Sequence, residues 1–213
     1  MNKRLFKDYR NIKKSPPNGI WIELSNENNI YNWDFVISGP KDTLFEDGLY
    51  WGKIEFPQEF PIKAPKVKMI TPSGRFKTDE WICMSMTHFH QEEWNPSWNG
   101  SSILLGLQIF MNDIKNEGIG SLINISENEI KKFTLNSIKW NLNQENYKKL
   151  FPQIVCAKYN NCSTNGNHSI HIAEFNNKEK QKINRNSYYM SLEFVCFFCC
   201  ILLCTVTFYV QSN

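Results

Sequence analysis

The sequence predicts an α+β fold: an N-terminal helix, a four-stranded antiparallel sheet and C-terminal helices, followed by a C-terminal transmembrane helix. Four strand-like runs succeed one another without an intervening helical pattern, and helical periodicity is confined to the segments before and after them. Short connections between consecutive strands favour antiparallel pairing, because parallel strands need a long crossover between them. A long uncharged run close to the C-terminus adds the membrane-spanning helix to this prediction.

The first helix is predicted within residues 1–14, where Leu5, Phe6, Tyr9 and Ile12 recur at helical spacing between basic residues. A Ser-Pro-Pro segment followed by a glycine ends this helix. The strand predictions rest on runs of aromatic and β-branched residues that are bounded by Asn, Asp, Gly and Pro. These runs are Trp21–Leu24, Trp33–Ser38, Leu49–Phe56 and Lys66–Ile70.

Helical patterns return after an irregular segment, residues 73–98, in which no periodicity is visible. Ser101 or Ser102 is expected to begin a buried helix, and a capping box formed by Ser126 and Glu129 is expected to begin the next. A short last helix should end just before a proline. Ordered, non-repetitive segments of this length inside a domain are usually functional, so residues 73–98 are the expected location of the site.

Three parts are expected along the chain: a folded domain over 1–152, a flexible linker over 153–191 and a transmembrane tail anchor over 192–210. The linker is rich in Asn and Lys and poor in apolar residues, which is typical of a tether. Within the anchor, the 17 residues from Phe194 to Val210 would extend roughly 25 Å as a helix. That length suits the thin bilayer of the endoplasmic reticulum, which is about 27 Å.

Two alternative interpretations of this tail are a buried core helix and a signal for lipid-anchor attachment. A core helix needs a large apolar partner surface, which the preceding polar segment does not supply. Lipid-anchor attachment requires a secretory leader, and the first 14 residues contain no apolar core of that kind. Basic residues between Lys178 and Arg185 precede the span, so the folded domain is expected to face the cytosol in a single-pass arrangement.

Composition argues against two classes of protein. With 24 Lys and Arg against 21 Asp and Glu, the net charge of +3 is small for a dedicated nucleic-acid binder, so no nucleic acid is expected as a partner. Four of the seven cysteines lie in the apolar tail, an arrangement unsuited to a disulfide framework. In the reducing cytosol, the isolated Cys83 is expected to be catalytic, metal-binding or merely buried.

Four short motifs lie near Cys83, and the third of them contains it: FPQEFPIKAPKV, TPSGRF, ICMSM and WNPSW. Their order and spacing, together with the order of the predicted elements, resemble the ubiquitin-conjugating enzymes, and more closely the tail-anchored branch of that family in the endoplasmic reticulum. The resemblance covers residues 1 to about 152 and extends to the tail. It implies the ubiquitin-conjugating fold, and it places Cys83 at the family's acceptor cysteine, which carries ubiquitin as a thioester.

The resemblance also implies catalytic roles for Ser73 and His90. The family's usual His-Pro-Asn motif is replaced here by a Thr-Pro-Ser sequence that ends at Ser73. Ser73 either donates a hydrogen bond to the developing oxyanion or only supports the turn with Gly74. His90 matches a histidine of the anchored branch and would orient or deprotonate the incoming nucleophile, although Gln91 follows it where proline is usual.

No bound cofactor or metal is expected. Cys83, His88 and His90 are residue types that ligate metals, but a structural zinc site needs four ligands and the segment contains no fourth Cys or His. The resemblance implies that ATP is used by the activating enzyme and is not bound by this chain.

Partner surfaces follow from the same resemblance, which implies ubiquitin, a ubiquitin-activating enzyme, RING-type ubiquitin ligases and the endoplasmic reticulum membrane as partners. The positions that match the activating-enzyme contact are Lys3, Arg4 and Lys7. The positions that match the ligase contact are Phe6, Ile62, Pro96 and Ser97. Solvated charge and ordinary packing are the alternative interpretation of each position.

The expected function is therefore the transfer of ubiquitin from Cys83 to proteins at the endoplasmic reticulum membrane, in the degradation of misfolded proteins. One alternative is a catalytically inactive, tail-anchored scaffold that binds ubiquitin or ligases. Ser73 mildly favours the scaffold, whereas the presence of Cys83 argues against it. A second alternative is a membrane-tethered interaction domain unrelated to ubiquitin, which only the set of motifs opposes.

Overall fold

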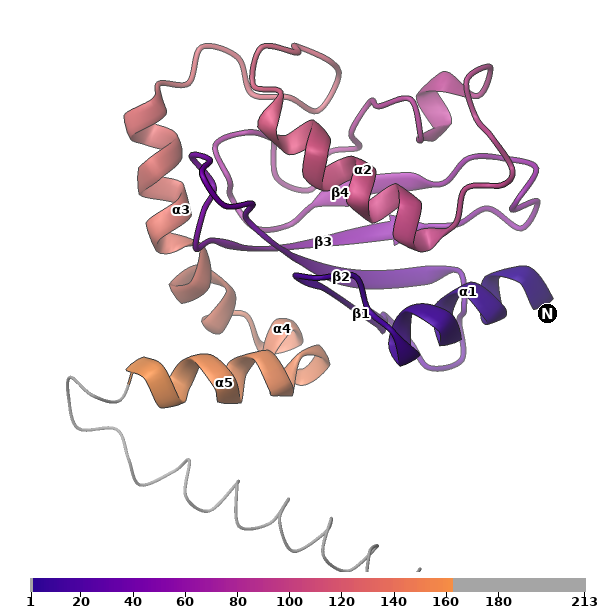
Figure 1. Cartoon of the computed structure of the whole chain (residues 1–213), viewed down its shortest axis with the longest axis horizontal. Helices are drawn as coiled ribbons and strands as arrows, with labels where there is room; N and C mark the ends of the chain where they lie inside the picture. Colours follow the sequence, from indigo (N-terminus) through magenta and orange to yellow (C-terminus); the bar gives the residue numbers. More distant parts are fainter. Residues whose placement is uncertain (1, 163–213) are drawn as a thin grey trace, which may run out of the picture. The chain divides into compact units, whose positions relative to one another are not determined.

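The computed structural model describes residues 2–162, and this part of the chain contains five α-helices, one short 3-10 helix and four strands (Figure 1). The helices are α1 (Lys3–Lys14), η1 (His88–His90), α2 (Gly100–Asn112), α3 (Glu127–Leu142), α4 (Glu145–Leu150) and α5 (Pro152–Cys162). The strands are β1 (Ile20–Leu24), β2 (Asn32–Ser38), β3 (Leu49–Glu55) and β4 (Lys66–Met69). The predicted order of an N-terminal helix, four strands and C-terminal helices is confirmed.

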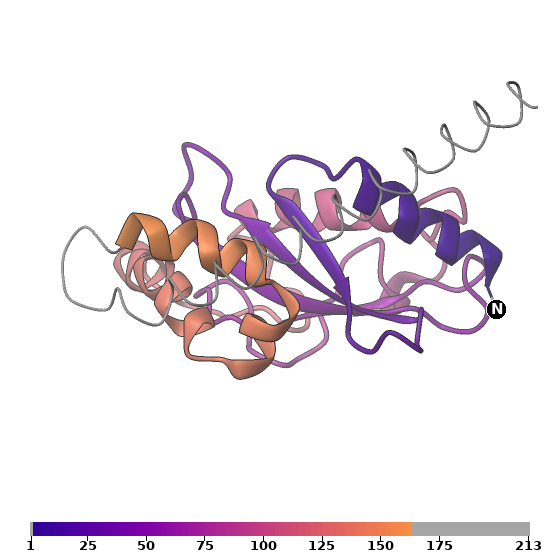
Figure 2. The ribbon, with the colours of Figure 1, turned by 90° about the horizontal axis from the view of Figure 1, so that it is seen from below.

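The strands form one antiparallel sheet in the order β1-β2-β3-β4, which is the arrangement that the short connections predicted. Every strand boundary lies within one residue of its predicted position. The register places Trp33 of β2 opposite Leu24 of β1 and Ile54 of β3, so apolar side chains of neighbouring strands share one face. Figure 2 shows the twist that the strands give the sheet.

Two hydrophobic clusters lie on the two faces of the sheet. The larger cluster contains Trp33 and Phe35 of β2, together with buried side chains of α1 and α2. The second cluster contains Val36 of β2 and Trp51 of β3, and Tyr147 of α4 packs edge-on against Trp51. Because side chains alternate along a strand, Val36 points to the opposite face from its neighbours Phe35 and Ile37. β2 is therefore buried on both faces, apart from its ends.

Helices α2 and α3 each begin at a residue whose side chain caps the helix. The capping box at α3 is confirmed, because Ser126 accepts a hydrogen bond from the Glu129 backbone N–H and the Glu129 carboxylate accepts one from the Ser126 backbone N–H. Helix α2 begins at Gly100, one or two residues before the predicted start at Ser101 or Ser102, and Asn99 caps it by accepting a hydrogen bond from the Ser102 N–H at 3.0 Å. Serine and asparagine are both good N-cap residues, so local preference does not select between adjacent positions.

Helix α5 occupies the first residues of the range expected to be a linker. Ile154, near its start, is buried in the second cluster beside Phe151, and the contacts group Met1–Cys156 into one compact unit. The predicted tail anchor, 192–210, lies outside the described residues. Among residues 2–162, no helix is long and apolar enough to cross a membrane.

Tyr50 gives the fold an expected sensitivity to alkaline pH. Its hydroxyl donates to the Phe45 carbonyl at 3.1 Å and lies 3.0 Å from the Thr134 hydroxyl, and burial raises its pKa from 10.0 to about 12. The folded protein therefore binds the phenol proton more tightly than the unfolded chain does. This contribution to the free energy of unfolding is fully present below pH 10 and is lost as the pH rises from about 10 to about 12. We expect the melting temperature to drop over this range, and to drop less steeply in Tyr50→Phe. Equal slopes for both proteins, measured by circular dichroism, would contradict this assignment.

Candidate active site

Cys83 lies on an irregular segment that is held between β4 and a later loop. The Ile82 N–H donates to the Val67 carbonyl at 2.8 Å, and the Cys83 N–H donates to the Ile119 carbonyl at 3.0 Å. Ile82 is completely buried, whereas Cys83 is partly exposed. The buried isoleucine therefore anchors the segment and leaves the neighbouring thiol at the surface.

An open cavity of about 510 Å³ lies beside Cys83. Its walls come from the cysteine segment, from η1 and the residues after it, from α2 and from the loop that follows α2. The polar and apolar side chains that give the cavity its chemistry are Ser85, His90, Glu93, Ile109, Asp113 and Asn116. The cysteine thiol is thus accessible from a cleft that also contains a histidine, two carboxylates and two neutral hydrogen-bond donors.

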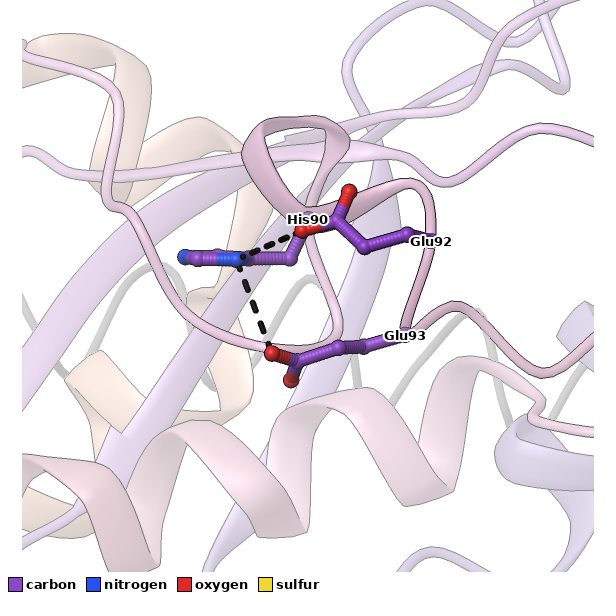
Figure 3. Close-up of side chains that lie close together, drawn as sticks. All are labelled: His90, Glu92 and Glu93. Atoms are coloured by element: carbon purple, nitrogen blue, oxygen red, sulfur yellow. Dashed lines mark hydrogen bonds and ion pairs between the residues drawn. The ribbon is translucent and has the colours of Figure 1, made fainter.

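The His90 imidazole lies within hydrogen-bond distance of the Cys83 thiol. Its Nε2 atom lies 3.1 Å from the Cys83 Sγ atom, within hydrogen-bond distance for sulfur. Its Nδ1 atom lies 3.2 Å from the Glu92 carboxylate and 3.7 Å from the Glu93 carboxylate, and Figure 3 shows both carboxylates directed at this ring nitrogen. The structure therefore brings together Cys83 and His90, which the sequence analysis proposed separately.

Thr87 fixes the backbone between the cysteine and the histidine. It is fully buried, its hydroxyl lies within 3.1 Å of the Met84 N–H and of the Ile82 and Met84 carbonyls, and its own carbonyl accepts from the His90 N–H. Together these bonds close the turn that returns His90 to the thiol. Sequence reasoning missed Thr87. No local pattern signalled its role, because the bonds of a buried hydroxyl to the backbone appear only in the folded segment.

Ser73 does not line the cavity. It is fully buried, and its hydroxyl accepts hydrogen bonds from the Arg75 N–H at 3.2 Å and the Phe76 N–H at 3.3 Å. Gly74 follows it in a left-handed conformation, with φ of 73°. Of the two roles left open by the sequence, this geometry favours support of the turn. Ser85 and Asn116, which sequence reasoning did not single out, are the neutral donors that reach the cavity.

Arg75 links that turn to the loop after α2. Its guanidinium is almost completely buried, stacks over Phe76 and Phe110, and donates to the Asn116 carbonyl at 3.0 Å. Burial lowers the pKa of this guanidinium from its ordinary value, although Asp113 opposes the shift. Two further nitrogens of Arg75 have no partner within the described residues. The arginine therefore holds a cavity-lining loop, including Asn116, at the cost of incomplete hydrogen bonding.

A cluster of three side chains that could hold a metal ion lies beside the thiol, and it differs from the three residues considered and rejected as a zinc site from the sequence. His90, Glu92 and Glu93 bring their ligand atoms within 4.8 Å of one another, and both glutamates are exposed. Cys83 and His88 do not belong to this cluster. It offers three ligands rather than the four of a structural zinc site, and the same atoms already pair with one another through the His90 ring.

Comparison with known proteins decides the family. The family model described as "Ubiquitin-conjugating enzyme" matches residues 4–134, which include the whole sheet, the cavity and Cys83. The chain belongs to the ubiquitin-conjugating enzyme family. This ubiquitin-conjugating domain therefore has the α+β fold that the resemblance implied, with an N-terminal helix and a four-stranded antiparallel sheet.

Three curated family members show how far the similarity extends. The chain is 42% identical over 153 residues to probable ubiquitin-conjugating enzyme E2 33 of Arabidopsis thaliana, covering 72% of this chain and 62% of that protein. It is 41% identical over 154 residues to ubiquitin-conjugating enzyme E2 6 of Candida glabrata, with 72% and 61% covered. It is 43% identical over 152 residues to human ubiquitin-conjugating enzyme E2 J2, with 71% and 58% covered. The matched region thus spans about three fifths of the length of these relatives.

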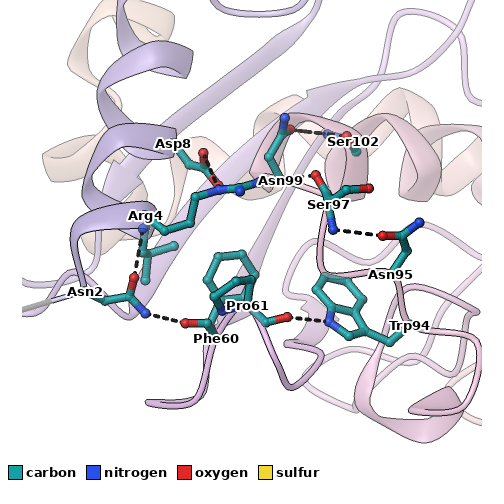
Figure 4. Close-up of polar contacts among 11 residues, drawn as sticks. Asn2, Arg4, Asp8, Phe60, Pro61, Trp94, Asn95, Ser97, Asn99 and Ser102 are labelled. Atoms are coloured by element: carbon teal, nitrogen blue, oxygen red, sulfur yellow. Dashed lines mark hydrogen bonds and ion pairs between the residues drawn. The ribbon is translucent and has the colours of Figure 1, made fainter.

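The expected partner positions of this ubiquitin-conjugating domain lie on elements that the structure ties together. The Asn2 side chain donates to the Phe60 carbonyl at 2.6 Å, the Trp94 indole donates to the Pro61 carbonyl at 2.8 Å, and Arg4 donates to the Ser97 carbonyl at 3.2 Å (Figure 4). These bonds join α1 to the two loops that carry the ligase positions. The four positions that match the ligase contact are all exposed: Phe6, Ile62, Pro96 and Ser97.

The three positions expected to contact the activating enzyme differ in exposure and in their bonds to the rest of the domain. Lys3 and Lys7 are exposed on α1, whereas the Arg4 guanidinium lies 3.2 Å from the Asp8 carboxylate as well as bonding to Ser97. Burial raises the pKa of Asp8, and the neighbouring Arg4 opposes that shift. Arg4 therefore has a structural role that Lys3 and Lys7 lack.

Proposed function

We propose that this chain accepts ubiquitin as a thioester on Cys83 from an activating enzyme and transfers it to other proteins. The observation that carries the proposal is the accessible Cys83 thiol with the His90 Nε2 atom 3.1 Å from its sulfur, at the edge of an open cavity. A thiol needs accessibility and thiolate character to act as a nucleophile, and a neighbouring imidazole supplies the second. The names of its relatives support the same activity.

The first step loads the enzyme. His90 Nε2 accepts the proton of the Cys83 thiol, and the resulting thiolate attacks the thioester carbonyl that links the ubiquitin C-terminus to the activating enzyme. A carbon–sulfur bond to Cys83 forms, the bond to the activating enzyme's cysteine breaks, and the departing thiolate takes up the proton. Since one thioester replaces another, the step is nearly balanced in free energy and needs no bound cofactor. ATP is consumed by the activating enzyme.

The second step transfers ubiquitin to an amine or a hydroxyl of the substrate. The nucleophile attacks the carbonyl carbon held on Cys83, and the developing oxyanion needs a hydrogen-bond donor. Ser85 and Asn116 line the cavity and can supply that donor, whereas Ser73 is buried and does not line the cavity. Because the sulfur of the thioester carries no proton, His90 Nε2 is free to accept the proton of the nucleophile.

We further propose that the chain works at the endoplasmic reticulum membrane, with its catalytic domain in the cytosol, in the degradation of misfolded proteins. The apolar run within 192–210 and the basic residues before it support an anchor, and 153–191 would be its tether. A tethered enzyme meets membrane-bound RING-type ligases at high effective concentration, so strong intrinsic affinity for the ligase is unnecessary. Exposed Phe6 and Ile62 are suited to such a contact.

The test is direct loading of the full chain, purified in a mild detergent. The chain is incubated with activating enzyme, ATP and ubiquitin, and the products are separated on gels with and without reductant. We expect an adduct that disappears on addition of thiol. Absence of any adduct from protein that circular dichroism shows to be folded would reject the enzyme and favour the inactive scaffold, for which the missing asparagine at Ser73 is the supporting observation.

A further inference from the structure

The His90 imidazole lies between the thiol and two carboxylates. One nitrogen, Nε2, faces the Cys83 sulfur at 3.1 Å. The other, Nδ1, faces one oxygen of Glu92 at 3.2 Å and one oxygen of Glu93 at 3.7 Å (Figure 3). A neutral imidazole carries its proton on only one nitrogen, so the partners of Nδ1 decide what Nε2 is able to do.

We infer that Glu92 and Glu93 are positioning residues that act on ubiquitin transfer through His90, an inference that rests on the proposed function. Carboxylates only accept hydrogen bonds, so they select the tautomer that carries its proton on Nδ1. The lone pair of Nε2 then points at Cys83. When Nε2 takes up a proton during the reaction, the two negative charges stabilise the positive charge that the ring acquires.

Glu92 and Glu93 are exposed, but both carboxylates face the same nitrogen of His90, so their effects on the imidazole add. Glu92 and Glu93 have side chains that are 71% and 55% exposed, and a single exposed ion pair contributes little. Since both oxygens lie close to the same Nδ1, loss of one leaves the other in place. We therefore expect redundancy, and the informative variant replaces both residues. Glu93 also lines the cavity, so its charge lies beside the path of the incoming nucleophile.

The loop that carries the two glutamates is fixed by other residues. Gln91 accepts from the Ala64 N–H at 3.0 Å and donates to the Ile62 carbonyl at 3.1 Å. On the other side, the buried Trp94 donates to the Pro61 carbonyl at 2.8 Å. Because these anchors flank the glutamates, the two carboxylates are not needed to hold the loop. Their common feature is the contact with His90.

In the transfer step these groups have a defined proton balance. The substrate oxygen or nitrogen forms a bond to the thioester carbonyl carbon while its proton moves to His90 Nε2. The carbonyl carbon then breaks its bond to the Cys83 sulfur, which leaves as a thiolate. The proton on Nε2 passes to that thiolate and restores the starting thiol, with the Nδ1 proton held by the two carboxylates throughout.

The experiment compares Glu92→Gln/Glu93→Gln with wild type in single-turnover discharge of the loaded full chain onto free lysine and onto glycerol. We expect loading to slow by about threefold, because His90 also activates the thiol, and the discharge rate constant at saturating nucleophile to fall by about tenfold, with the half-saturating nucleophile concentration unchanged. Glu145→Gln, which removes another exposed, paired glutamate, should match wild type in each measurement. Wild-type discharge by the double variant would overturn the inference.

A second comparison separates action through His90 from a structural effect. In a His90→Gln background, Glu92→Gln/Glu93→Gln should cause no additional loss of discharge, because the group on which the carboxylates act is gone. Equal losses with and without His90 would overturn the inference. A Glu92→Asp/Glu93→Asp variant keeps both charges and should recover at least a third of the lost rate.

A third measurement does not depend on ubiquitin, so failure of the proposed function would not obscure the result. Iodoacetamide alkylation of Cys83 in the free chain, followed by mass spectrometry of its peptide, reports how well His90 activates the thiol. We expect alkylation to slow by about threefold or more in the double glutamine variant. Cys156, a partly buried free thiol on α5, supplies an internal reference whose rate should not change. Unchanged Cys83 alkylation would overturn the inference, even if wild type cannot be loaded.

Discussion

Replacing Cys83 by alanine should abolish the thiol-sensitive ubiquitin adduct of this chain, and Cys83→Ser should form an adduct that survives reductant. Alanine removes the nucleophile, whereas the serine hydroxyl forms an oxyester, which added thiols cleave slowly. Both outcomes are read on the gels that test loading. Cys156→Ala, which removes a second partly exposed thiol, should load like wild type. A thiol-sensitive adduct in Cys83→Ala would show that another cysteine carries ubiquitin.

Loss of the adduct must come from the missing thiol rather than from unfolding. Cys83 is only partly buried, and it is held by its backbone N–H, which an alanine retains. We therefore expect the free energy of unfolding to change by less than about 1 kcal/mol in Cys83→Ala. Urea titration of the variant and of wild type measures this change. A larger loss of stability would mean that the thiol side chain contributes to packing around Ile82.

Local sequence patterns were sufficient to predict the sheet. β2 is the clearest element, because Trp33, Phe35 and Ile37 alternate with residues that face the other way, and Gly39 and Pro40 follow directly. The capping box of α3 was predicted for a similar reason, since both of its partners lie within four residues of each other. Such features need no knowledge of distant contacts.

The C-terminal end of the domain was harder to predict. The segment after Pro152 is followed by a long polar stretch, and composition favoured a tether. The structure instead shows a helix, whose Ile154 is buried with Phe151 and Trp51. Tertiary packing of a few apolar side chains stabilises a helix that composition alone does not predict.

The sequence could propose residues for the candidate site but not their geometry. Resemblance identified Cys83 and His90, but their 3.1 Å contact depends on the turn that Thr87 closes through backbone bonds. Arg75 lies in a motif that the sequence analysis quoted, yet its contact with the Asn116 carbonyl joins residues far apart in the chain. Such contacts follow from the folded arrangement, and no local period or cap signals them.

Asn141→Leu should be among the most destabilising substitutions in the domain. Asn141 is fully buried on α3, where its Oδ1 accepts from the Thr71 hydroxyl at 2.5 Å and its Nδ2 donates to the Leu49 carbonyl at 2.9 Å. The Thr71 hydroxyl in turn accepts from the Trp51 N–H at 2.8 Å. Leucine has a similar size but leaves the Leu49 carbonyl and the Thr71 hydroxyl without their partner inside the protein. Unpaired buried groups cost about 1–3 kcal/mol each, so we expect a loss of roughly 2–4 kcal/mol in urea unfolding.

A matched substitution on the same helix separates burial from helix preference. Asn136 is exposed on α3 and bonds only to the Lys132 carbonyl one turn earlier, so Asn136→Leu should change stability by less than about 0.5 kcal/mol. Thr71 also begins the Thr-Pro-Ser turn that leads to Arg75. Weakening its bonds should therefore loosen the loop at Asn116 and slow ubiquitin discharge as well as unfold the domain more easily. Equal stability of the two leucine variants would contradict the role given to the buried amide, because, of these two asparagines, only Asn141 bonds to β3 and to Thr71.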